Sequence, residues 1–170
     1  MAALFKELWR LCLFRTSPAN LPSLPIVAVA LLIADWLASV LIIRTLSPEF
    51  DAARVLLNIA VAQLALAALV LGMLRLGSKS ARWAQTMSGL YGSDLLLTLL
   101  FGMLLPIARN LGPSPGNMME ILLFLWTVTI YGYIVHLAME IPLLAGMLAA
   151  LGILIVGFGF SEALVGSANA

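Results

Sequence analysis

The sequence predicts an all-α polytopic membrane helix bundle, and two observations lead to that prediction. The 170-residue chain is 63% hydrophobic, its mean hydropathy is +1.10, and only 10% of its residues are charged. Soluble domains carry roughly 25% charged residues, so a soluble fold of this length could not bury so much apolar surface. The apolar residues also fall in long runs, each near the ~20 residues that a membrane-spanning helix needs.

Each run is expected to be a helix, because backbone polar groups in lipid must be satisfied within their own segment. Turn residues separate the runs in "SPEFDAAR", "GSKSARWAQTM" and "RNLGPSPGN", and the Pro-Ser-Pro-Gly of the last cannot continue a helix. Only "MEIP" separates the final two runs, which predicts a tight antiparallel hairpin with Pro142 near the first turn of the last helix. The single transmembrane domain is placed at 21–170, with spans at 22–46, 54–76, 88–108, 118–139 and 142–165.

Residues 1–20 are predicted to form an amphipathic interfacial helix and a turn. Lys6 and Arg10 lie four residues apart on one side of this helix, and Trp9 is expected near the lipid headgroups. The opposite side carries apolar residues at helical spacing: Leu4, Phe5, Leu8, Leu11 and Cys12. The segment is too short and too charged to span a bilayer.

The distribution of Lys and Arg predicts the orientation of the chain in the membrane. With the N-terminus in the cytoplasm, six basic residues lie on the cytoplasmic side and three on the other side. Because basic residues are enriched in cytoplasmic loops, we expect a bacterial inner-membrane protein with its N-terminus inside and its C-terminus outside. The two sets are Lys6, Arg10, Arg15, Arg75, Lys79 and Arg82 inside, and Arg44, Arg54 and Arg109 outside.

Asp35 lies about halfway through the first predicted span. An aspartate there must be protonated, hydrogen-bonded or exposed to a wet cavity. Asn58 and Gln63 on the second span are its expected polar partners. Two interpretations stay open: a hydrogen-bonded clamp between helices worth ~1 kcal/mol, or a substrate or proton site.

A second polar group is expected near the cytoplasmic ends of the third and fourth spans. His136 and Glu140 are four residues apart and share a helix face, which Tyr133 extends. The topology predicts that these three residues converge with Asp94. Such a histidine can titrate near neutral pH, which suits proton coupling. The alternative is that His136 and Glu140 mark the membrane boundary and stabilise a turn.

Small residues are frequent in the last predicted span. They include the small-xxx-small pairs Ala145/Ala149 and Gly146/Ala150, and Gly152. Small residues let helix backbones approach closely, so we expect these positions to pack inside one bundle, with a homodimer face as the alternative.

The composition and motifs exclude most classes of enzyme and metal protein. One cysteine and one histidine rule out an intramolecular disulfide and bis-histidine haem ligation, and neither a metal site nor a cofactor is expected. G-x-S-x-G, H-E-x-x-H and P-loop motifs are missing, so we expect a non-enzymatic protein. A net charge of +1 argues against nucleic-acid binding. The expected partners are the lipid bilayer and either another membrane protein or a second copy.

Two stretches, 81–108 and 123–156, resemble the later part of bacterial Yip1-like membrane proteins. A short basic loop precedes a span that ends in "LLP", and a "W-x-x-x-I-x-G" span leads into a small-residue-rich final span. The Tyr-Gly-Pro-type signature of eukaryotic members is not reproduced at 91–93 or 131–133. The resemblance implies five spans and a membrane-organising or trafficking role without catalysis.

The sequence therefore predicts two candidate functions. The first is a scaffold or accessory subunit that acts through helix contacts. The second is a small proton-coupled transporter or channel component that uses the intramembrane carboxylates and His136.

Overall fold

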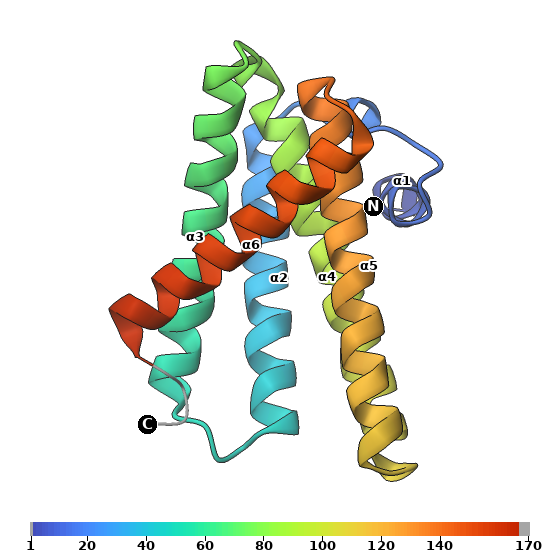
Figure 1. Ribbon diagram of the computed structural model, residues 1–170, viewed down its shortest axis with the longest axis vertical. Helices are drawn as coiled ribbons and strands as arrows, with labels where there is room; N and C mark the ends of the chain where they lie inside the picture. The colour runs from blue at the N-terminus through green and yellow to red at the C-terminus, as the bar shows by residue number, and fades with distance from the viewer. Residues whose placement is uncertain (1, 167–170) are drawn as a thin grey trace.

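The computed structural model describes residues 2–166, and every regular element in that range is a helix. Five helices, α2 to α6, are long and apolar enough to cross a membrane, which confirms the predicted membrane helix bundle (Figure 1). The elements are α1 (Ala2–Cys12), η1 (Pro18–Asn20), α2 (Pro25–Leu46), α3 (Ala52–Leu76), η2 (Ser80–Arg82), α4 (Trp83–Asn110), α5 (Pro113–Met139) and α6 (Leu143–Val165).

Two helices begin five residues earlier than the sequence predicted. Helix α4 starts at Trp83, so the end of the predicted loop "GSKSARWAQTM" is helical. Helix α5 starts at Pro113, because a proline has the φ angle of the first helical turn and needs no N–H partner there. The Pro-Ser-Pro-Gly stretch therefore opens a helix. The sharp reversal before it falls on Gly112, whose φ of 125° favours glycine.

The order of packing in the bundle differs from the order in the sequence. Helix α2 packs chiefly against α4, α4 against α5, α5 against α6, and α6 against α3. The hairpin neighbours α2 and α3 share a smaller contact. Figure 1 shows α6 crossing the bundle diagonally from α5 to α3. Polar residues on α2, α3, α4 and α5 consequently meet in the interior, with α6 covering them.

Close packing of α5 and α6 depends on two glycines. A Cβ atom on Gly146 would lie 2.5 Å from the carbonyl oxygen of Gly132, and one on Gly132 would lie 2.7 Å from the Cα of Met147. Of the predicted packing residues, Gly146 and Ala150 are buried and Ala149 is half-buried. Ala145 and Gly152 instead face outward, and a Cβ on Gly152 would meet nothing within 4 Å. The helical repeat places them on the opposite face.

Helix α1 lies across the other helices and is seen end-on in Figure 1. Leu8, Leu11 and Cys12 are buried. The Leu8 side chain fills the space above Gly92 of α4, where a Cβ atom would lie 2.4 Å from it. Phe5, which the sequence placed on the same side as these residues, is 57% exposed, and Trp9 is 45% exposed. The two aromatic rings therefore extend beyond the packed face of α1.

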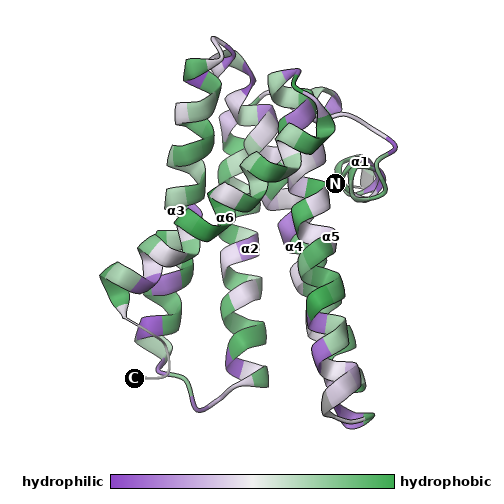
Figure 2. Cartoon of the chain, in the orientation of Figure 1, coloured by the Kyte–Doolittle hydropathy of each residue, from purple (hydrophilic) through white to green (hydrophobic). Residues whose placement is uncertain are grey.

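The outer surface of the helices is apolar. Figure 2 shows hydrophobic residues along all the long helices, with hydrophilic residues gathered mostly near their ends. Large exposed side chains occur on each of these helices, among them Leu41, Leu64, Met103, Leu125 and Leu148. Exposure of such a large apolar surface to water is unfavourable, whereas a lipid bilayer can cover it.

Candidate functional site

Asp35 is fully buried at the centre of the bundle. Its carboxyl accepts a hydrogen bond from Gln63 Nε2 of α3 at 2.5 Å and one from Thr98 Oγ1 of α4 at 3.5 Å. Gln63, one of the two partners predicted from the sequence, is itself held by Tyr91, whose hydroxyl donates to the Gln63 backbone carbonyl at 2.9 Å. Asp35 is thus fixed by side chains from two other helices.

Asp94 forms the second half of a carboxyl pair. Its side chain is half-buried on α4 and lies close to the Asp35 carboxyl and to the Tyr131 hydroxyl of α5. A hydrogen bond between two carboxyl groups requires that one of them carries a proton. Two carboxylates close together in a low-dielectric site would repel each other strongly, and a proton shared between them would remove that repulsion.

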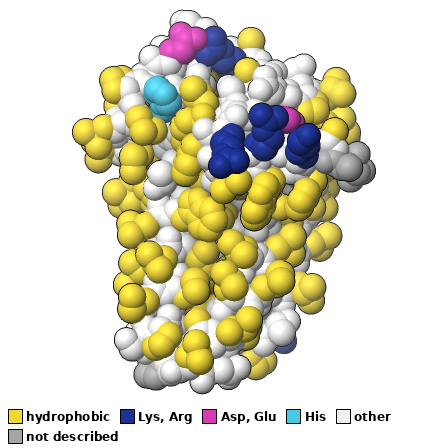
Figure 3. Space-filling model, turned by 90° about the vertical axis from the view of Figure 1, so that its right-hand side faces the viewer, with side chains coloured by type: hydrophobic (Ala, Val, Ile, Leu, Met, Phe, Trp, Pro, Cys, Tyr) yellow, Lys and Arg dark blue, Asp and Glu magenta, His cyan; other side chains and the backbone are white. Residues whose placement is uncertain are grey.

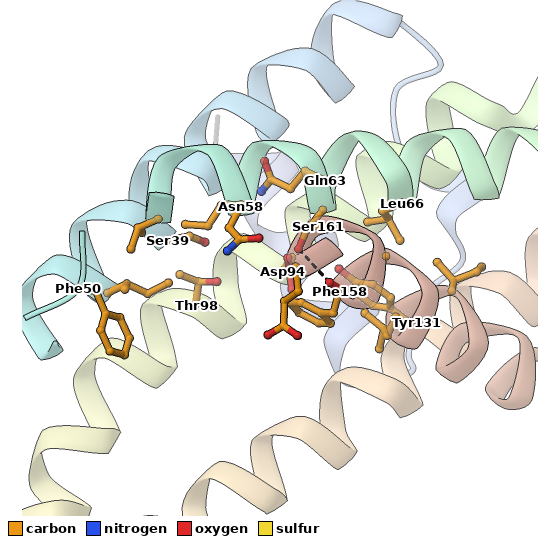
Figure 4. Close-up of a pocket in the computed structure, with 18 residues that line it drawn as sticks. Ser39, Phe50, Asn58, Gln63, Leu66, Asp94, Thr98, Tyr131, Phe158 and Ser161 are labelled. Atoms are coloured by element: carbon orange, nitrogen blue, oxygen red, sulfur yellow. Dashed lines mark hydrogen bonds between the residues drawn. The ribbon is translucent and has the colours of Figure 1, made fainter. Parts of the chain in front are cut away.

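Asp94 also lies on the wall of a 410 Å³ cavity between α2, α3, α4, α5 and α6. Figure 4 shows Asn58, Asp94, Thr98, Tyr131 and Phe158 among the residues that line this cavity. A second cavity of 270 Å³ adjoins it and shares Ser39, Ile43, Asp94 and Thr98. The polar lining residues of the larger cavity are Ser39, Asn58, Gln63, Asp94, Thr98, Tyr131, Ser161 and Glu162.

The larger cavity extends from mid-bundle toward one end of the molecule. Phe50, Asn58 and Glu162 lie at the end where the α2–α3 loop and the end of α6 are found. Toward the other end the bundle is closed by a packed apolar core that includes Leu74, Leu90 and Ile134, none of which has exposed surface. This packed core therefore closes the bundle on that side of the cavity.

Asn58 does not pair with Asp35, in contrast to the expectation from the sequence. Its Nδ2 donates to the backbone carbonyl of Gly166 at 3.0 Å, which ties α3 to the end of α6. Its Oδ1 is buried without a hydrogen-bond partner in the part of the chain that the structure describes. The two amide positions on α3 are five residues apart, so the helix turns Asn58 away from Asp35.

The predicted convergence of Asp94, Tyr133, His136 and Glu140 is not found. Tyr133 donates to the backbone carbonyl of Thr16 at 3.2 Å, and its ring meets Phe14 edge-on. The His136 ring hydrogen-bonds the backbone carbonyl of Ile141 through Nδ1. Asp94 lies near Asp35 in the middle of the bundle, whereas Glu140 lies at the turn that follows α5. The residue of α5 that lies close to Asp94 is Tyr131.

Glu140 belongs to a structural turn between α5 and α6. It adopts a left-handed conformation with φ of 57° and forms ion pairs of 2.6 Å with both Lys79 and Arg82. These two neighbours, Lys79 first, lower the pKa of the exposed Glu140 carboxyl. Lys79 and Arg82 also donate to the last backbone carbonyls of α5, at Met139 and Ala138, where the helix dipole favours positive charge. This arrangement matches the turn-stabilising alternative.

Tyr131, Thr98 and Ser39 were not predicted as site residues. Thr98 follows Asp94 by four residues, so the i, i+4 rule could have placed it on the same face of α4. Tyr131 is two residues before Tyr133 and therefore lies on a different face of the helix. The prediction considered only the face that carries Tyr133 and His136. Ser39 follows Asp35 by four residues and had the same signal as Thr98.

Comparisons with known proteins give no further assignment. No family model, curated protein or solved structure matches this chain. Among the described residues, no three His, Cys, Asp or Glu side chains form a group that could hold a metal ion.

Proposed function

We propose that this protein is a small proton-linked carrier or channel component that binds a solute in the 410 Å³ cavity of its transmembrane bundle. The observation that supports the proposal is the position of Asp94 on the cavity wall, with the fully buried Asp35 carboxyl close to it inside the bundle. Ionisable groups within spans are costly, and they are typical of proton relays and substrate pathways. His136, which the sequence included in this mechanism, has no part in it.

The carboxyl pair allows a ligand to replace a proton: when the ligand bonds to one carboxyl group, the pair releases its proton. Gln63 and Thr98 hold Asp35 on the inner side of the pair, while Asp94 faces the cavity. A ligand that bonds to Asp94 competes with the proton shared between the carboxyls. The proton then leaves through the cavity, so ligand affinity and proton affinity are linked.

Transport would require a second conformation in which the opposite end of the bundle opens. The packed residues Leu74, Leu90 and Ile134 close that end in this structure. Movement of α6 relative to α3 and α5 would change access, because α6 covers the cavity and contacts both helices. Two conformations with different affinity for ligand and proton are the minimum requirement for coupling.

The predicted orientation completes this proposal. With the N-terminus in the cytoplasm of a bacterial cell, the cavity opens to the outside. Helix α1 would then lie at the inner membrane surface, with Phe5 and Trp9 directed to lipid and Lys6 and Arg10 to headgroups. Figure 3 shows basic side chains gathered beside a hydrophobic surface on this face of the molecule. Such a division is typical of interfacial helices.

A scaffold or accessory-subunit role, which the Yip1-like resemblance implies, is the second candidate. The outward-facing small residues Ala145 and Gly152 of α6 favour it, because they leave room for a helix of another chain. The buried pair Gly146 and Gly132 gives no such support, since it is used inside the bundle. Absence of catalysis stays a prediction under both candidates.

Solute-driven proton movement tests the proposal. Purified protein would be placed in vesicles that contain a pH-sensitive dye, and cationic, neutral and anionic solutes would be added in turn. At least one class should drive proton flux in the wild type and in Glu49→Gln, which removes an exposed carboxylate outside the cavity. Asp94→Asn should abolish that flux. Identical traces from the wild type and Asp94→Asn for every solute would reject the proposal.

A further inference from the structure

We propose that the ligand of the larger cavity is a small organic cation, whose ammonium group contacts Asp94 and Asn58 and whose apolar part packs against Phe50 and Phe158. The inference rests on the proposed function, because it names the ligand class of that same cavity. Three observations support it: the charge of the cavity lining, the hydrogen-bond acceptors at the cavity that remain available to a ligand, and the apolar cavity walls.

The charge of the cavity lining is negative. Asp94 and Glu162 supply carboxyl groups, with Asp35 close to Asp94, and none of the described residues that line the cavity is Lys, Arg or His. The three arginines at this end have other partners. Arg44 donates to the Phe50 backbone carbonyl at 2.6 Å, Arg54 pairs with Asp51 at 3.7 Å, and Arg109 pairs with Glu120 at 2.9 Å. An anionic ligand would find no counter-charge here, whereas a cation would.

The hydrogen-bonding groups at the cavity are mostly acceptors. Asn58 Oδ1 is buried without a partner in the described chain, while the Asn58 amide nitrogen is already bonded to Gly166. The Ser161 hydroxyl donates to the Phe158 carbonyl at 3.0 Å, which leaves its lone pairs for a ligand. A buried acceptor without a donor costs free energy, and a ligand N–H group would satisfy it.

Apolar and aromatic walls complete the match to an organic cation. Phe50 and Phe158 line the cavity together with Leu66 and Ile153 (Figure 4). Aromatic faces attract cations when water is excluded, and the volume lies in the range of pockets that hold small organic ligands. A metal ion would leave most of this surface uncovered, so an ammonium group with an apolar body fits better.

Binding of the cation would displace the proton that the two carboxyls share. The O–H bond of the pair breaks, its proton passes to water at the open end, and an ammonium N–H bonds to the freed carboxylate. The charge of the occupied site then stays constant. The other titratable groups near Asp94 are Asp35 from α2, Tyr91 from α4, Tyr131 from α5 and Cys12 from α1, with Glu162 of α6 at the same cavity. Cation affinity should therefore fall as the pH is lowered.

Calorimetric titration of the protein in lipid nanodiscs tests the ligand class. Benzylammonium, benzyl alcohol and benzoate share one ring and differ in charge. Benzylammonium should bind at least ~10-fold more tightly than the other two, a difference of ~1.4 kcal/mol. Asp94→Asn should weaken its binding by ~10-fold, and Glu162→Gln, at the exposed mouth, by a smaller factor. The control Glu49→Gln should bind as the wild type does.

The outcomes separate this inference from the proposed function. Equal binding of benzyl alcohol and benzylammonium, or unchanged cation affinity in both Asp94→Asn and Glu162→Gln, would overturn the cation site. Proton flux driven by neutral or anionic solutes alone would overturn it too, while the proton-linked function stands. Cation binding that is the same at about pH 6 and about pH 8 would instead reject the shared proton and leave the cation preference in place.

Discussion

The side-chain amide of Gln63 donates to the Asp35 carboxyl at 2.5 Å and joins α3 to α2 in the middle of the bundle. Both residues lie inside apolar spans, where an unpaired carboxyl or amide would be costly. The bond is a clamp on one side of a carboxyl whose other side meets Asp94 at a cavity. The hydrogen bond agrees with the clamp interpretation of Asp35, and the substrate or proton site stays a prediction.

Removing the Asp35 carboxyl should destabilise the bundle. Asp35→Leu leaves the donors of Gln63 and Thr98 unpaired, so we expect a loss of ~1–3 kcal/mol in the free energy of unfolding in detergent. Asp35→Asn, which keeps an acceptor, should lose less. The double variant Asp35→Leu/Gln63→Leu should recover part of the loss, because one unpaired donor is gone. A Leu variant as stable as the wild type would contradict the clamp.

Alanine substitutions on α6 should separate buried from exposed glycines. Gly146→Ala places a Cβ 2.5 Å from the Gly132 carbonyl oxygen and 2.9 Å from the His136 backbone nitrogen, so α5 and α6 must move apart. We expect a loss of ~1–3 kcal/mol, measured as a lower melting temperature. Gly152→Ala is the matched control, since its Cβ meets nothing within 4 Å. Equal melting temperatures would show that the two helices are not packed through Gly146.

The Glu140 ion pairs should stabilise the protein at neutral pH but not in acid. Because Lys79 and Arg82 lower the pKa of Glu140 below its ordinary value of 4.5, its contribution is present above pH 4.5 and is lost as the pH falls through the folded-state pKa. Glu140→Gln should melt below the wild type at neutral pH, and the difference should shrink in acid and in high salt. Glu49→Gln should show neither effect. A constant difference at every pH would argue against the ion pairs.

Cys12 should react slowly with maleimide. Burial raises the pKa of its thiol to about 11, so only ~0.1% would be thiolate at about pH 8, and the side chain is 3% exposed. Gly92→Leu removes the space that Leu8 of α1 occupies, so α1 should detach and labelling should accelerate. A cysteine placed at exposed Leu13 in a Cys12→Ser background gives the fast reference rate. Rapid labelling of wild-type Cys12 would show that α1 is not held against α4.

The orientation can be tested with reporters fused to the C-terminus. With the N-terminus in the cytoplasm and five spans, a reporter active only outside the cytoplasm should be active there. Replacement of Arg75, Lys79 and Arg82 with glutamine should weaken this preference, because these residues supply half of the positive charge predicted on the cytoplasmic side. Activity of a cytoplasm-only reporter at the C-terminus would invert the orientation and the direction in which the cavity opens.

Hydropathy and turn residues were enough to determine the kind of molecule and the approximate spans. A run such as 142–165 is apolar on all sides, so its helical state follows from the bilayer alone and needs no knowledge of neighbours. The sequence does not show how such a helix is rotated about its axis, because an all-apolar helix has no polar face that fixes which side faces the bundle interior. Single polar residues such as Asp35 and Asp94 can be seen in the sequence, but the helix each one faces cannot.

The sequence by itself determined an all-helical membrane protein with five candidate spans, a mid-span aspartate and Gln63 as a partner for it. Only the tertiary structure decided that Asp94 meets Asp35 and Tyr131, while Tyr133, His136 and Glu140 serve the turn and the docking of the N-terminal segment. The physical reason is that depth in the membrane follows from counting residues along a helix. Contact depends on helix rotation and on which helices are neighbours, and these are set by close packing at positions such as Gly132 and Gly146.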